Sequence, residues 1–128
     1  MANELILIIE DDPNSRKLVR DVLQVKGYQT IESETAEEGI RLAKEKHPAL
    51  ILMDIQLPGI SGIEALKILR TDLKTQSIPV IAVTASVMNQ QQSLITDAGF
   101  DGFEGKPVSV AALLKKVRGL LDRAGLSP

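Results

Sequence analysis

Three short apolar runs stand out along the chain: Leu5–Ile9, Leu50–Met53 and Val80–Val83. Runs of this length that are apolar at every position are typical of strands buried on both faces, as in a parallel sheet covered by helices. Two weaker segments, Tyr28–Glu32 and Gly102–Glu104, are expected to form further strands. The pattern therefore predicts five strands.

Segments with helical spacing separate these strands. Each of the first three begins with a capping side chain at the expected spacing: Asp12–Pro13, Thr35–Glu38 and Ser61–Glu64. Gly27 is expected to end the first helix and His47–Pro48 the second. We expect His47 to be a solvated residue at that helix end.

Two more helical stretches complete the chain, a weak one that includes Ile95 and Ala98 and an amphipathic one over Leu113–Leu121. The strict alternation of strands and helices favours an α/β fold, with a parallel sheet, helices on both faces and right-handed crossovers. The chain has 128 residues, of which 44% are hydrophobic. This length predicts a single domain over residues 1–128, with its core at about 4–122 and a short C-terminal tail.

Composition and charge exclude several kinds of protein. Fifteen basic and seventeen acidic residues give a net charge of −2, without the basic excess that neutralises a nucleic-acid backbone, so no direct nucleic-acid binding is expected. The absence of cysteine and the single histidine argue against a disulfide framework and a zinc site. The chain also lacks a membrane-length apolar run and a secretion signal, which predicts a cytoplasmic protein without membrane contact.

Polar residues follow four of the predicted strands. The first strand leads into Glu10, Asp11 and Asp12, the third into Asp54, the fourth into Thr84 and the fifth to Lys106. In open α/β sheets, sites form beyond the carboxyl ends of the strands. Carboxylates gathered there repel one another unless a cation neutralises them, and Mg²⁺ prefers such oxygen ligands. Asp11 and Asp54 suit that role.

A carboxylate such as Asp54 can act as a nucleophile and form an aspartyl phosphate. Phosphoryl transfer depends mainly on positioning and charge stabilisation, which Mg²⁺ and Lys106 would supply, while Thr84 would donate a hydrogen bond to a phosphoryl oxygen. A lone Asp after a strand is more often a cap, and this is the role we predict for Asp12. The functional interpretation of the others depends on their occurrence together at four strand ends.

These residues make the chain resemble the receiver domains of two-component response regulators, from Leu5 to about Leu121. The motifs that carry the resemblance are Ile8–Asp12, Leu52–Gly59, Val83–Ala85 and Gly105–Pro107. The resemblance implies a flavodoxin-like, doubly wound sheet with the strand order 2-1-3-4-5. Because no output domain follows, the chain is most similar to single-domain regulators, and Met1 favours a whole gene product.

The resemblance also implies a role for each residue of the site. Asp54 would be the phosphoacceptor, and Asp11, Asp54 and the backbone carbonyl of Gln56 would bind magnesium directly, with Glu10 as a ligand through water. Lys106 would pair with the phosphoryl group. Thr84 would be the switch hydroxyl and Phe103 the switch aromatic. A histidine kinase or phosphotransfer protein would phosphorylate Asp54. The surface made by the fourth helix, the fifth strand and the last helix would then change its affinity for a downstream protein. No enzymatic activity is expected beyond phosphorylation and dephosphorylation of Asp54 itself.

Other functions fit less well. A receiver-like scaffold that takes no phosphate is one alternative, against which the complete acidic set argues. A phosphatase of the haloacid-dehalogenase type needs a second acid two residues after its nucleophile, and Gln56 cannot act as a general acid. A nucleotide-binding domain would need a glycine-rich loop after the first strand. A histidine phosphotransfer protein would need an exposed histidine in a helix bundle, whereas His47 closes a helix of an alternating chain.

Overall fold

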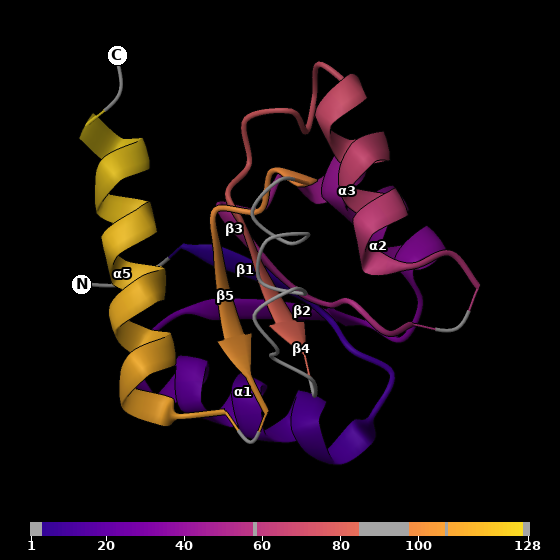
Figure 1. Cartoon of the computed structure of the whole chain (residues 1–128). Helices are drawn as coiled ribbons and strands as arrows, with labels where there is room; N and C mark the ends of the chain where they lie inside the picture. Colours follow the sequence, from indigo (N-terminus) through magenta and orange to yellow (C-terminus); the bar gives the residue numbers. More distant parts are fainter. Residues whose placement is uncertain (1–3, 58, 85–97, 107, 127–128) are drawn as a thin grey trace.

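The computed structural model describes residues 4–57, 59–84, 98–106 and 108–126 of the chain. Its centre is a parallel sheet (Figure 1). The strands are β1 (Leu5–Ile9), β2 (Gln29–Ser33), β3 (Leu50–Asp54), β4 (Val80–Thr84) and β5 (Gly102–Gly105), in the spatial order β2-β1-β3-β4-β5. All four strand pairings are parallel. The five predicted strands and the order implied by the resemblance are confirmed.

Helices α1 (Pro13–Val25), α2 (Ala36–Lys46), α3 (Gly62–Thr71) and α5 (Val110–Leu126) connect or follow these strands. The three predicted caps are present, because the side chains of Asp12, Thr35 and Ser61 each accept a hydrogen bond from the backbone N–H three residues later. These bonds satisfy donors that the first turn of a helix leaves without a partner. The helical stretch predicted around Ile95 lies outside the described residues.

The helices cover both faces of the sheet, as predicted (Figure 1). Side chains alternate between the faces of a strand. Ile6 and Ile8 of β1 therefore pack in one core with residues of α1 and α5, whereas Leu7 and Ile9 pack in the other with residues of α2 and α3. Every residue of β3 and β4 is buried. This explains why the central strands are apolar at nearly every position.

The ends of α1 and α2 use left-handed backbone conformations. Gly27 follows α1 with a φ of 92°, and His47 caps α2 with a φ of 50°. His47 is exposed and its N–H donates to the Ala43 carbonyl at 3.1 Å. The prediction of a solvated histidine at the helix end is confirmed.

The parallel sheet brings the carboxyl ends of its strands to one edge. Backbone hydrogen bonds continue beyond the strands there, from Ile55 N–H to the Val83 carbonyl at 3.1 Å and from Lys106 N–H to the Thr84 carbonyl at 2.8 Å. The residues that directly follow β3 and β5 are thus held by the sheet itself. Within the described residues, no helix combines the length and the apolar character needed to cross a membrane.

Candidate functional site

Asp54 is the last residue of β3 and only 5% exposed. Its Oδ1 accepts a hydrogen bond from the Gln56 N–H at 2.9 Å, and its Oδ2 lies 3.1 Å from Lys106 Nζ. Each carboxylate oxygen thus has a partner from a different segment. These two contacts fix the direction of the Asp54 carboxylate at the edge of the sheet.

Lys106 connects two buried carboxylates. Its Nζ lies 2.6 Å from Glu10 Oε1 in addition to its contact with Asp54. Burial lowers the pKa of Lys106, but the hydrogen bonds to Glu10 and Asp54 outweigh it and raise that pKa above its ordinary value. Lys106 therefore remains a cation and offsets part of the negative charge in the site.

Glu10 follows β1 and is 5% exposed. Its second oxygen accepts a hydrogen bond from the Asp12 N–H at 3.2 Å. Burial and the neighbouring Asp54 raise the pKa of Glu10 to about 7, although Lys106 and the Asp12 N–H act in the opposite direction. The protonation state of Glu10 consequently changes near neutral pH.

Asp11 completes an acidic cluster with Glu10 and Asp54. One carboxylate oxygen from each residue lies within 4.8 Å of the other two. The set offers oxygen ligands without nitrogen or sulfur, which suits a hard cation such as Mg²⁺ better than zinc or copper. Asp11 is exposed while the other two residues are buried, so the cluster opens to solvent on the side of Asp11.

Thr84 lies on β4, the strand beside that of Asp54, and Phe103 lies on β5, one strand further out. Thr84 ends β4, is 3% exposed, and accepts the Lys106 N–H through its carbonyl. Phe103 pairs with Ala82 across the sheet and is partly buried. Lys116 of α5 lies 5.6 Å from the centre of the Phe103 ring and donates to the Phe103 carbonyl at 2.7 Å. Phe103 is thus linked to α5.

The structure brings together four of the residues predicted for the site. Glu10, Asp11, Asp54 and Lys106 meet at one place, although the sequence separates the first from the last by 96 positions. Gln56 is exposed and contacts Asp54 through its N–H. The metal contact predicted for its carbonyl stays a prediction.

Arg16 also contacts the site and was missed in the sequence. Its Nη1 donates to the Glu10 carbonyl at 2.9 Å, while its other nitrogens pair with Glu32 and Glu34. A cation in the first turn of a helix opposes the helix dipole. A cation at this position in the sequence therefore indicates that Arg16 has acidic or carbonyl partners elsewhere in the fold, without identifying them.

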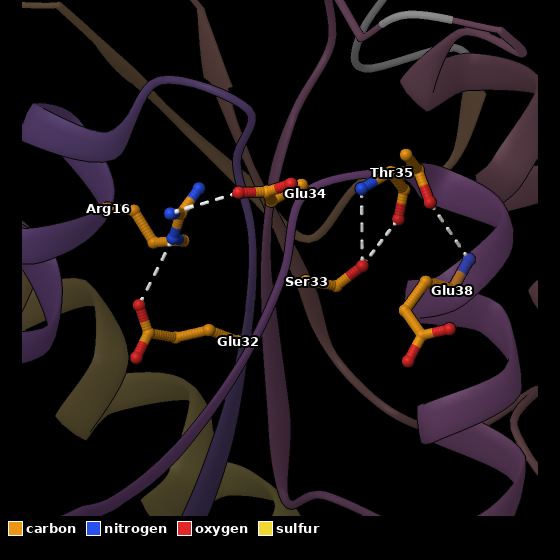
Figure 2. A pocket seen from close by; sticks show the side chains of 6 residues that line it. All are labelled: Arg16, Glu32, Ser33, Glu34, Thr35 and Glu38. Atoms are coloured by element: carbon orange, nitrogen blue, oxygen red, sulfur yellow. Dashed lines mark hydrogen bonds and ion pairs between the residues drawn. The ribbon is translucent and has the colours of Figure 1, made fainter.

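A hollow of about 530 Å³ lies beside Arg16 and carries none of the three clustered carboxylates. Figure 2 shows its lining, with Arg16 paired to two glutamates on one side and a capping network on the other. In that network the Ser33 hydroxyl donates to the Thr35 carbonyl at 2.6 Å, and the Thr35 hydroxyl accepts the Glu38 N–H at 3.2 Å. These partners lie within the protein, so we assign no ligand to the hollow.

Comparisons with known sequences agree with this geometry. The family model described as "Response regulator receiver domain" matches residues 6–118. The polar-differentiation response regulator DivK of Brucella ovis is 41% identical over 119 residues, which cover 93% of this chain and 97% of that protein. DivK of Brucella anthropi is 40% identical with the same coverage.

Solved structures show the same likeness. A CheY-like response regulator receiver domain protein from Methanospirillum hungatei matches with a TM-score of 0.86 and 29% identity, over 95% of this chain and 96% of that one. The receiver domain of the sensor histidine kinase PA1611 from Pseudomonas aeruginosa matches with a TM-score of 0.87 and 26% identity, over 94% of this chain and 99% of that one. That structure has a magnesium ion coordinated in its active-site cleft.

Proposed function

Since this chain belongs to the response regulator receiver domains, we propose that it is a single-domain switch in which Asp54 accepts a phosphoryl group from a histidine kinase or phosphotransfer protein. The observation that carries the proposal is the arrangement around Asp54. Its carboxylate lies at the carboxyl end of β3, in contact with Lys106 and within 4.8 Å of acidic oxygens of Glu10 and Asp11. A carboxylate that we propose as the nucleophile, a cation and an acidic cluster suited to a metal thus lie close together.

Mg²⁺ is the metal that we propose for this cluster. Asp11, Asp54 and the Gln56 carbonyl would hold it directly, and Glu10 through water. When bound, Mg²⁺ would neutralise charge on the phosphoryl oxygens. The all-oxygen cluster and the similarity to a receiver domain with bound magnesium support this choice.

The transfer itself requires little chemistry from the protein. An oxygen of Asp54 would form a bond to phosphorus while the bond between phosphorus and the donor nitrogen breaks, so the phosphoryl group moves without any change in redox state. Lys106 already reaches this carboxylate at 3.1 Å. Its ammonium is therefore placed to form a charge-assisted hydrogen bond with a phosphoryl oxygen on Asp54.

Signal output would pass through Thr84 and Phe103. The Thr84 hydroxyl would turn toward the phosphoryl group, Phe103 would follow inward, and the surface formed by β5, α5 and the segment between β4 and β5 would change its affinity for a downstream protein. Two connections support this route: a backbone hydrogen bond joins Thr84 to the segment of Lys106, and Phe103 contacts Lys116 of α5. Thr84→Ala should leave phosphorylation of Asp54 intact while abolishing its effect on partner binding. Partner binding that still responds to phosphorylation in this variant would refute the role of Thr84.

The decisive experiment is intact-mass analysis after incubation with acetyl phosphate, with and without Mg²⁺. We expect the wild type to gain one phosphoryl group only with Mg²⁺, and Asp54→Asn to gain none. Asp12→Asn is the matched control, because it removes a nearby acid and leaves a side chain that caps α1 equally well. This control should be phosphorylated like the wild type.

Beryllofluoride, which imitates a bound phosphoryl group, guards against a rapidly hydrolysed adduct. Failure of the wild type to gain mass and to respond to beryllofluoride would refute phosphorylation. The scaffold interpretation would then explain the protein better.

A further inference from the structure

Arg16 occupies an electrostatically unfavourable place in α1. It lies in the first turn, where the partial positive charge of the helix N-terminus repels a cation. Its side chain is only 16% exposed, so most of its five N–H donors need partners within the protein. The partners that it has indicate what this arginine does.

The guanidinium has three acceptors on two segments of the chain, the loop after β1 and the end of β2. Nη1 donates to the Glu10 carbonyl at 2.9 Å, Nε to Glu32 of β2 at 3.2 Å and Nη2 to Glu34 at 3.4 Å. Figure 2 shows the two carboxylate contacts of the arginine, with Glu34 and with Glu32. A planar guanidinium can serve acceptors in several directions with little loss of freedom per hydrogen bond. The loop after β1 is thus fastened to the end of β2.

The Glu10 carbonyl is the contact that bears on the site. This carbonyl shares one planar peptide unit with the Asp11 N–H and Cα, so holding it fixes the plane from which the Asp11 residue starts and limits where its side chain can lie. The Glu10 N–H is held as well, by the Ser33 carbonyl at 2.9 Å. With Arg16 in place, both backbone groups of Glu10 are fixed, and the carboxylates of Glu10 and Asp11 are directed toward Asp54.

We propose that Arg16 is a positioning residue for the acidic cluster and that its loss weakens Mg²⁺ binding; this inference rests on the proposed Mg²⁺-dependent function. Charge and geometry make opposite predictions for Arg16. Removal of a cation near an acidic site strengthens the binding of another cation by Coulomb's law. Loss of positioning lets the Glu10–Asp11 peptide rotate and weakens that binding. The sign of the change therefore separates the two effects.

Arg20 provides a matched control on the same helix, one turn later. The described contacts of its guanidinium are with Asp21 at 3.2 Å and Glu32 at 3.5 Å. Arg20→Met removes the same charge and one of the same glutamate contacts. It leaves the hydrogen bond from Arg16 to the Glu10 carbonyl in place.

The test is a calorimetric titration of the full chain with Mg²⁺, for the wild type, Arg16→Met, Arg16→Lys and Arg20→Met. Folding of each variant is checked by circular dichroism in EDTA. We expect Arg16→Met to weaken Mg²⁺ binding roughly tenfold, the lower end of the effect seen for residues that orient metal ligands. Arg20→Met should bind as tightly as the wild type or slightly more tightly. Arg16→Lys keeps the charge but not the planar fork, so we expect it to lose roughly threefold.

Two results would overturn the role of Arg16 and leave the proposed function standing. In the first, Arg16→Met binds Mg²⁺ as tightly as the wild type or more tightly. In the second, Arg16→Met and Arg20→Met weaken Mg²⁺ binding equally. If Arg16→Met does not fold, Arg16→Lys decides the question, and unchanged affinity in that variant overturns the inference. A wild-type protein that binds no Mg²⁺ would overturn both this inference and the proposed function.

Discussion

Gly62 is the residue whose substitution tests the packing beneath Asp54 most directly. It is the buried first residue of α3, and its backbone is not in the left-handed region. A Cβ at this position would lie 2.7 Å from the Asp54 carbonyl oxygen and 2.8 Å from Ile55 Cα. Both are backbone atoms, so no side-chain rotation relieves the overlap. We conclude that lack of space requires glycine here.

The expected cost of Gly62→Ala follows from these contacts. Overpacking of a close-packed site costs about 1–3 kcal/mol. Separation of α3 from the sheet would also strain the hydrogen bond from Gly62 N–H to the Ile55 carbonyl, which is 2.9 Å long and contributes about 1 kcal/mol. We therefore expect the free energy of unfolding to fall by about 2–4 kcal/mol. Phosphorylation should slow as well, because Asp54 is displaced.

Gly119 supplies a control of opposite sign. It is exposed within α5, and a Cβ there would meet no atom within 4 Å. Alanine is a better helix former than glycine, so Gly119→Ala should raise the free energy of unfolding by about 0.5–1 kcal/mol.

Urea unfolding in EDTA, followed by circular dichroism, measures both variants against the wild type. For a domain of this size, each kcal/mol shifts the melting temperature by about 3–5 °C, so thermal unfolding provides a second measure. If the midpoint of urea unfolding for Gly62→Ala equals or exceeds that of the wild type, the steric explanation is refuted.

Three further changes test other parts of the structure. His47→Gly should stabilise the protein by about 0.5–1 kcal/mol, because His47 holds a left-handed conformation at the end of α2; a loss of stability in urea unfolding would contradict this. Lys106→Met should bind Mg²⁺ more tightly, because the Lys106 ammonium contacts two carboxylates of the cluster. The same variant should accept phosphate more slowly. Calorimetry measures the first effect and the phosphorylation rate measures the second. Since burial and Asp54 raise the pKa of Glu10 to about 7, a proton competes with Mg²⁺ at this carboxylate below that pH. The affinity should thus fall by up to about fivefold from pH 7 to pH 6, and Glu10→Gln should flatten this dependence; a fall confined to pH values below 5 would contradict the raised pKa.

The sequence by itself determined the central strands and the residues at which three of the helices begin. The apolar runs identified β1, β3 and β4 because central strands of a covered parallel sheet are buried on both faces. The caps Asp12, Thr35 and Ser61 were predictable because a helix start needs a side-chain acceptor at a fixed spacing. These are local requirements, and local sequence is sufficient to meet them.

The contacts between distant segments were decided only by the tertiary structure. Lys106 meets Glu10 and Asp54 because β5 ends at the same edge of the sheet as β1 and β3, which also places Glu10 in the environment that raises its pKa. The sequence likewise held no sign that Gly62 approaches the Asp54 backbone, and the position of Arg16 near the start of α1 did not identify the Glu10 carbonyl as its partner. Such contacts depend on how helices pack on the sheet, and the packing is set by the whole core rather than by the residues that touch.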